Sequence, residues 1–346
     1  MISISNLVFR MKKNAVGLAT IAILSSMVLV TLVGATNIYA GKKDYLASAA
    51  PHDYSVTGTN VDVTSTQKVM DDFLSQSGNQ VNRKTEVTYI YFGIKEQEKN
   101  KLTIFSKNER KVLPKSIFIV FSQATYKQLT GKDLNLTSNQ VGLFTKNKTL
   151  KDQKSVSING QNYQIHDGLN DFIKGKVPNN FTIISSDYSY LVVPDTDNFK
   201  ESIKGTATTQ TTYIGVNVKD PAHDAKKNSD LLDKLADKET QQLDGQTTGV
   251  PWFNLITNSR YDVEGALNGF VSGTLFIGIF LSIIFMIGTV LVIYYKQISE
   301  GYEDRERFVI LQKIGLDDQQ VKKTIRKQVL TVFFLPLIFA FIHLAF

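Results

Sequence analysis

The sequence predicts an α-helical membrane protein with two full transmembrane helices, a third that is truncated, and a large inserted α+β domain. Two charge-free runs carry this prediction, residues 14–41 and residues 266–295. A helix rises about 1.5 Å per residue and the hydrocarbon core is about 30 Å thick, so both runs can cross a bilayer. The segment between them, residues 42–264, is polar and carries both helical and strand patterns. We therefore expect a folded domain held between two membrane helices.

Residues 1–13 precede the first membrane helix. Apolar residues recur there at helical spacing, and the segment ends in a basic cluster of Arg10, Lys12 and Lys13. This pattern is typical of a juxtamembrane helix, and basic residues favour the cytoplasmic side. We therefore expect a cytoplasmic N-terminus and an extracytoplasmic domain over residues 42–264. A cleavable signal peptide is the alternative, but its apolar part is only about 7–15 residues long.

Hydrophobic periodicity in the inserted domain predicts both helices and strands. The helix candidates are Thr64–Leu74 and Lys226–Leu243, each with one apolar side. The strand candidates are Thr85–Ile94, Lys101–Phe105, Ser116–Ser122, Ser155–Ile165, Phe181–Ser185, Tyr188–Val193 and Thr211–Val218. Asn159 and Gly160 interrupt one of them and both tolerate the positive φ of a tight turn, so we expect a hairpin there.

The second transmembrane helix is expected over residues 265–295. Its first half carries Gly265, Gly269 and Gly273 at four-residue spacing, which places three residues without side chains on one face. Another helix can pack closely on such a face. The alternative is that glycine is simply commoner in membrane helices than in soluble ones.

The C-terminal part contains a charged segment and a third apolar run. Residues 296–328 are helical in pattern with a break at Gly315, and we expect them to form a cytoplasmic loop and helix. Residues 329–346 then form an apolar run that ends without a flanking charge. We expect this run to be a truncated transmembrane helix.

Composition and motifs exclude several classes of function. The formal net charge of +7 lies mainly beside the membrane helices, so no nucleic-acid partner is expected. The chain has no cysteine, and its four histidines lack the spacing of a metal site, so neither a metal nor a cofactor is expected. The sequence contains neither a phosphate-binding Gly-x-x-x-x-Gly-Lys-Ser/Thr segment nor a Gly-x-Ser-x-Gly nucleophile segment. We therefore predict no catalytic residue and no enzyme activity in this chain.

Five basic residues are the candidate ligand contacts of the inserted domain: Arg83, Lys84, Lys107, Arg110 and Lys111. Their charges can hold a lipid diphosphate through charge-assisted hydrogen bonds. The simpler interpretation is a solvated surface, because lysine-rich segments on a domain of this size are usually exposed to water.

Two segments near the membrane carry a family resemblance, and together with their surroundings they make up about a third of the chain. Residues 306–321, in which a helical pattern ends near Gly315, resemble the cytoplasmic loop of FtsX-like ABC transporter permeases. Residues 9–19, followed by an anchor and a large outer domain, are similar to the C-terminal half of BceB-type permeases. That family provides resistance to bacitracin and other antimicrobial peptides in Gram-positive bacteria.

The resemblance implies a permease subunit of the cell membrane that is not itself an enzyme. In BceB-type permeases the outer domain lies between the seventh and eighth transmembrane helices, so this chain would be a C-terminal fragment. The other helices would then be on a separate chain or lost by truncation. The implied partners are a dimeric ABC ATPase, a sensor histidine kinase, membrane lipids, and a peptide antibiotic or its undecaprenyl-phosphate-linked target. The implied ATPase-coupling surface on the cytoplasmic side consists of Arg305, Arg307, Lys313, Gly315, Leu316 and Val321.

Two alternatives remain open at this point. One is a membrane-anchored extracellular sensor or receptor that works without an ATPase. The other is a different FtsX-like machine, for lipoprotein release or for cell division. An ATPase partner would separate the receptor from both kinds of permease.

Overall fold

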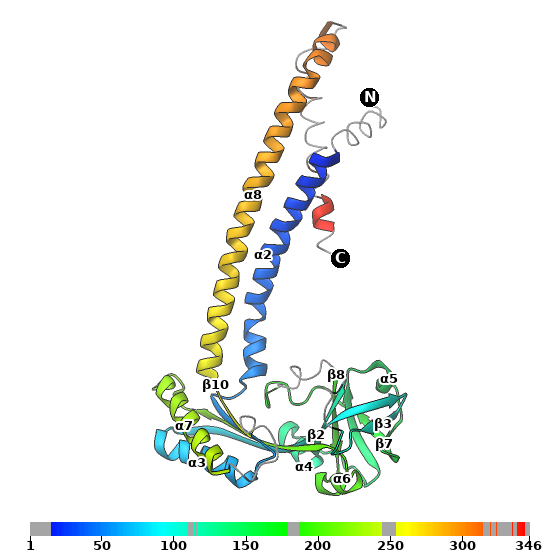
Figure 1. The fold of residues 1–346 in the computed structure, drawn as a ribbon, viewed down its shortest axis with the longest axis vertical. Coiled ribbons are helices and arrows are strands. Elements are labelled where there is room, and N and C mark those ends of the chain that lie inside the picture. The colour runs from blue at the N-terminus through cyan, green and yellow to red at the C-terminus, as the bar shows by residue number, and fades with distance from the viewer. Residues whose placement is uncertain are drawn as a thin grey trace. The chain divides into compact units, whose positions relative to one another are not determined.

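The computed structural model describes residues 15–109, 114, 116–178, 187–243 and 254–313, together with Gln319, Lys323, Phe334 and residues 338–342. The chain divides into two compact units. One consists of Met1–Lys42 and Asn268–Phe346, and the other of Lys43–Leu267. Figure 1 shows the course of the chain through both.

Two long helices, α2 (Ala15–Ala49) and α8 (Arg260–Lys313), contain the charge-free runs. Both are long and apolar enough to cross a membrane, within Ala15–Ala49 and Arg260–Ser299. The helical backbone continues beyond the apolar runs because polar residues such as Lys42 and Lys296 also sustain i to i−4 hydrogen bonds. Hydropathy therefore locates the apolar part of each helix and not its end.

Within the first unit, α2 and α8 pack in antiparallel directions. A Cβ built on Gly278 of α8 would lie 2.6 Å from the Cβ of Ala35 in α2, so the two helices approach closely at this glycine. One turn further, the hydroxyls of Thr31 and Ser282 form a hydrogen bond of 2.8 Å. Small residues and a hydroxyl pair are a common way to hold two membrane helices together.

The second unit is built on a ten-stranded sheet in the order β10-β1-β9-β2-β3-β6-β7-β5-β8-β4. Its strands are β1 (Tyr54–Thr59), β2 (Val81–Glu98), β3 (Lys101–Ile104), β4 (Ser116–Ser122), β5 (Gln140–Thr145), β6 (Ser155–Ile158), β7 (Gln161–Gly168), β8 (Asp187–Val193), β9 (Thr208–Val218) and β10 (Leu255–Ser259). Its helices are α3 (Val63–Ser77), α4 (Gln123–Thr130), α5 (Lys148–Lys151), α6 (Thr196–Ser202) and α7 (Ala225–Leu243).

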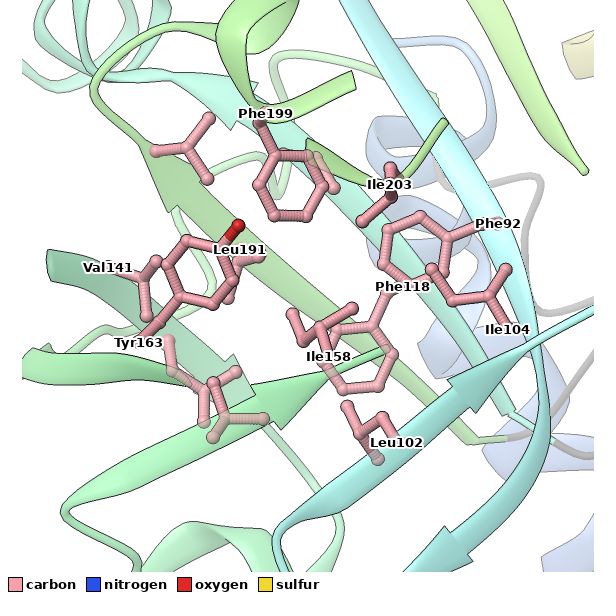
Figure 2. Packing of buried hydrophobic residues seen from close by; sticks show 14 of the residues in the cluster. Phe92, Leu102, Ile104, Phe118, Val141, Ile158, Tyr163, Leu191, Phe199 and Ile203 are labelled. Atoms are coloured by element: carbon pink, nitrogen blue, oxygen red, sulfur yellow. The ribbon is translucent and has the colours of Figure 1, made fainter. Parts of the chain in front are cut away.

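Seven strands of this sheet close into a ring, because β2 pairs with both β3 and β4. The order around the ring is β2-β3-β6-β7-β5-β8-β4. Alternate residues of these strands form one buried cluster, and Figure 2 shows Phe92, Leu102, Phe118 and Leu191 within it, with Phe199 of α6. Removing these side chains from water favours the closed ring.

The opposite face of β4 is buried as well. Ile117, Ile119 and Phe121 belong to a second cluster, where the Phe121 ring makes an edge contact with Tyr190 at a centroid distance of 6.2 Å. Burial on both faces explains why β4 has an unbroken apolar sequence, as a central strand does.

The remaining strands, β10, β1 and β9, extend the sheet beyond the ring, with α3 and α7 packed against them. Tyr54, Phe73, Ile214 and Leu232 are buried in this third cluster. Strand β2 belongs to both parts, since it pairs with β9 along most of its length and with β4 and β3 near its end. This shared strand connects the helix-covered sheet to the ring.

The structure confirms the local predictions that rest on strong patterns. The predicted helices correspond to α3 and α7, and the predicted hairpin to β6 and β7, with φ of 49° at Asn159 and 85° at Gly160. The predicted strands match β2, β3, β4, β8 and β9, while Phe181–Ser185 lies outside the described residues. Strands β1, β5 and β10 and helices α4, α5 and α6 were not predicted, because their short patterns do not stand out from loop sequence.

Candidate functional site

The candidate functional site, called the junction below, lies within the unit of Lys43–Leu267, where the last residues of α2 and the first residues of α8 join the sheet. Helix α2 ends at Ala49 and β1 begins at Tyr54, whereas β10 ends at Ser259 and α8 begins at Arg260 (Figure 1). Strands β1 and β10 pair in antiparallel directions, with Tyr54 opposite Ser259. Both helices are therefore joined to neighbouring strands of one sheet.

Hydrogen bonds hold the junction together. The Arg260 backbone amide donates to the Asp53 carbonyl at 2.9 Å, and the Arg260 guanidinium donates to the Ala50 carbonyl at 3.3 Å. The Asn258 side-chain amide donates to the Ala49 carbonyl at 3.2 Å. These bonds satisfy carbonyl groups at the C-terminal end of α2 with donors from β10 and α8, which fixes the two chain segments to each other.

His52 lies in the short connection between α2 and β1, and 3% of its surface is exposed. Its Nδ1 lies 2.7 Å from the Tyr213 hydroxyl of β9, and its Nε2 lies 3.0 Å from the Thr85 hydroxyl of β2. The ring fits because residue 215 is glycine: a Cβ there would lie 2.5 Å from Nδ1. His52 therefore connects the end of α2 to two strands beyond β1.

The electrostatics of this contact favour a neutral ring. Burial, with a smaller contribution from the Arg83 charge, lowers the pKa of His52 from 6.5 to about 4. Burial also raises the pKa of the Tyr213 hydroxyl, so this group keeps its proton. A neutral imidazole has one donor and one acceptor nitrogen, which matches two hydroxyl neighbours.

Helix α7 supports the junction from its side. The Ser229 hydroxyl donates to the Asp262 carboxylate in the first turn of α8, and the Thr257 hydroxyl of β10 donates to Asp233 at 2.5 Å. On the other side of the junction, the Val218 amide at the end of β9 donates to the Asp53 carboxylate at 2.9 Å. These bonds tie the first turn of α8, strand β10 and the end of β9 to one another within the unit of Lys43–Leu267.

The predicted helix-packing glycines have no neighbour within the described part of this chain. A Cβ built on Gly265, Gly269 or Gly273 would meet nothing within 4 Å. The close approach of α2 and α8 occurs instead at Gly278. Gly278 and Ser282 form a small-x-x-x-small pair, and this spacing is the signal that could have identified the contact. Packing of the three predicted glycines on a further helix stays a prediction.

Of the six predicted coupling residues, Arg305, Arg307 and Lys313 lie in α8, and the Arg305 side chain is exposed. Gly315, Leu316 and Val321 lie outside the described residues, as do the first thirteen residues with their basic cluster. Their roles stay predictions.

Among the predicted ligand contacts that the structure describes, Arg83 and Lys107 lie far apart, and the ligand-binding role of the five residues stays a prediction. Arg83 lies on β2 opposite Asn217, near the end of β9, whereas the Lys107 amide donates to the Gly205 carbonyl, before β9 begins. About ten residues of extended strand, at roughly 3.3 Å each, separate the two positions. Lys84 lies 3.5 Å from Asp71 and 3.7 Å from Glu86. Arg110 and Lys111 lie outside the described residues.

Metal-ligating side chains do not gather in the part of the chain that the structure describes: no three His, Asp or Glu side chains are placed to hold an ion. The sequence predicts His52 only as a histidine that binds no metal. It does not predict a role for Asp53, Asn258 or Arg260. The available signal was position, since all four residues lie within a few residues of a long apolar helix.

Two curated proteins of Bacillus subtilis strain 168 are similar to parts of the chain. The ABC transporter permease protein YxdM is 34% identical over 73 residues, which covers 21% of this chain and 12% of that protein. The bacitracin export permease protein BceB is 28% identical over 134 residues, which covers 39% of this chain and 18% of that protein. The chain thus matches less than a fifth of either relative, and over these segments it is similar to ABC transporter permeases.

Two further comparisons add no family or fold. No family model matches the chain. A crystallised Bacillus anthracis protein described as a lipoprotein aligns with 50% of this chain and 91% of its own, at 11% identity and a TM-score of 0.28. A TM-score this low identifies no shared fold.

Proposed function

We propose that the chain is part of the permease of an FtsX-like ABC transporter of the BceB type. The similarity to YxdM and BceB supports the permease role, and the two long apolar helices support a place in the membrane. In this proposal the N-terminus is cytoplasmic and the domain of Lys43–Leu267 lies outside the cell. There it engages a peptide antibiotic such as bacitracin or the undecaprenyl-phosphate-linked target of that drug.

ATP hydrolysis takes place on a separate dimeric ATPase, which contacts the cytoplasmic surface around Arg305, Lys313 and Gly315. Movement at that surface passes along α8, which has no helix break between Arg260 and Lys313. A sensor histidine kinase is a further partner, and the same movement changes its activity. To transmit a movement from one side of the membrane to the other, the connecting helices must be stiff and must adopt only a few defined conformations.

The observation that carries this mechanism is the pairing of β1 with β10. Because each strand continues within a few residues into a long helix, a shift of α8 relative to α2 changes the forces on one strand pair. From there, β9 and β2 connect the pair to the seven-stranded ring. In this proposal, backbone hydrogen bonds within the unit of Lys43–Leu267 carry the movement from the ends of α2 and α8 into the sheet.

An insertion tests this mechanism. Three residues, Gly-Ser-Gly, are inserted between Ser259 and Arg260 in the complete transporter, and the matched control carries the same insertion in the β6–β7 turn after Gly160. We expect the junction insertion to abolish drug-stimulated ATPase activity and drug resistance, while the ATPase still co-purifies. The control insertion retains all three.

Equal activity of the two insertion variants would reject coupling through the junction. Absence of any ATPase in the purified complex would reject the permease class and favour a receptor. ATPase activity that no peptide antibiotic stimulates, in a complex that gives no resistance to such drugs, would instead favour a machine for lipoprotein release or cell division.

A further inference from the structure

A hollow of about 820 Å³ lies on the outer domain beside the first turns of α7 and α8. Lys226, Lys227 and Lys234 line it together with the apolar side chains of Ala225 and Leu231 and the ring of Tyr261. All of these lining residues belong to the unit of Lys43–Leu267. The hollow therefore combines ammonium groups with an apolar floor and one aromatic ring.

The charges of the hollow leave one ammonium group free for a ligand. Lys226 pairs with Asp230 at 2.7 Å, and Lys227 lies 3.7 Å from Asp224. Lys234 makes no ion pair with any residue that the structure describes. The lining itself contains three lysines and two aspartates, so it carries one net positive charge that an anionic group can match. Asp233 and Asp262, outside the lining, act on Lys226.

The hollow adjoins the start of the apolar part of α8. Tyr261, with 51% of its surface exposed, precedes the first residue of the charge-free run, Ala266, by five residues on the same helix. Helix α7 is held beside it by the hydrogen bond from Ser229 to Asp262. Five residues of helix correspond to about 7.5 Å. If the hydrocarbon core begins at Ala266, Tyr261 would lie at the level where tyrosine rings meet lipid headgroups.

We propose that this hollow binds the headgroup of an anionic phospholipid in the outer leaflet. The phosphate lies between Lys227 and Lys234, and the glycerol backbone rests on Leu231 and against the ring of Tyr261. Free phosphate would contact only the two lysines and not the apolar floor. The apolar floor and the proximity to the α8 apolar run both favour a lipid as the occupant.

The test is native mass spectrometry of the purified full chain with phosphatidylglycerol as the probe. The test variant is Lys227→Gln with Lys234→Gln, and the matched control is Lys238→Gln, an exposed lysine one turn beyond Lys234 that does not line the hollow. A lysine near an anionic surface is worth about a factor of five in binding, so we expect the test variant to bind the lipid at least roughly tenfold more weakly. The control should bind it as the unchanged chain does.

Three outcomes would overturn the proposal. The first is equal lipid binding by the test variant and the control, after near-ultraviolet circular dichroism has shown that both are folded. The second is equal retention of phosphatidylcholine, which would mean that the site does not select a net negative charge. The third is displacement of the lipid by millimolar inorganic phosphate, which would identify a site for a free anion. None of these readouts involves the ATPase or the drug, so they are independent of the proposed transport function.

Discussion

Tyr54 and Ser259 lie opposite each other on β1 and β10, although more than 200 residues of chain separate them. Tyr54 begins the first strand after α2, and Ser259 ends the last strand before α8. The strand that follows α2 and the strand that precedes α8 are thus neighbours in the sheet.

Cysteine labelling will test the expected membrane topology. The chain has no cysteine of its own, so a single introduced cysteine gives an unambiguous signal. We expect a membrane-impermeant maleimide to label Lys151→Cys, at the exposed last residue of α5, in intact cells. It should label Arg305→Cys, an exposed position on α8, only after permeabilisation. The reverse result would place the large domain in the cytoplasm and contradict the topology.

The α2–α8 contact depends on the absence of a side chain at Gly278. In a Thr31→Cys, Ser282→Cys background, whose parent hydroxyls are 2.8 Å apart, oxidation should form a disulfide in high yield. Adding Gly278→Leu should reduce this yield several-fold, because a Cβ alone already lies 2.6 Å from the Cβ of Ala35. Gly269→Leu, where a Cβ meets nothing within 4 Å, is the control. An equal loss of cross-linking in both variants would mean that Gly278 is not the determining contact.

Gly215 makes room for His52 and Tyr213. A Cβ at this position would lie 2.5 Å from both His52 Nδ1 and the Tyr213 hydroxyl, so we expect Gly215→Ala to lower the free energy of unfolding by about 1–3 kcal/mol. Gly168→Ala, at an open position, should change it little. In a His52→Ala background the Gly215→Ala penalty should shrink, because the imidazole is gone. Chemical denaturation followed by near-ultraviolet circular dichroism measures these differences, and a penalty unchanged by His52→Ala would contradict the contact.

We expect His52 to make the stability of the unit of Lys43–Leu267 sensitive to acid. Its pKa is lowered from 6.5 to about 4, so between these pH values the unfolded chain binds a proton that the folded chain does not. Stability is therefore lost as pH falls through this window, by up to about 3 kcal/mol at 1.4 kcal/mol per pKa unit. His52→Gln removes this dependence, so its deficit relative to the unchanged chain should be largest at pH 7 and narrow towards pH 4. If the free energy of unfolding of the two proteins differs by the same amount at every pH, His52 does not titrate as described.

The parts of the fold that depend on local patterns were predictable. The apolar runs of α2 and α8 and the unbroken apolar strand β4 stand out by their length and composition, and the amphipathic helix α7 stands out by its helical periodicity. The hairpin at Asn159 was equally clear, because few residue pairs tolerate two successive positive φ values.

The ring and the junction could not be predicted from the same patterns. Closure of the ring requires β2 to pair with both β3 and β4, and the junction requires β1 to pair with a strand at the far end of the domain. The hydrophobic periodicity of a single strand does not indicate which other strands it pairs with. The role of His52 likewise depends on Thr85 and Tyr213, which are distant in sequence.

The shared position of β1 and β10 also constrains how the domain is made. Synthesis proceeds from the N-terminus, so β1 emerges early and has no β10 beside it until almost the whole domain has been produced. The edge of β1 that faces β10 therefore stays open during synthesis, and unpaired strand edges are sites of aggregation. The sheet is completed only when α8 itself begins to leave the ribosome, which links the last step of folding to the insertion of that helix.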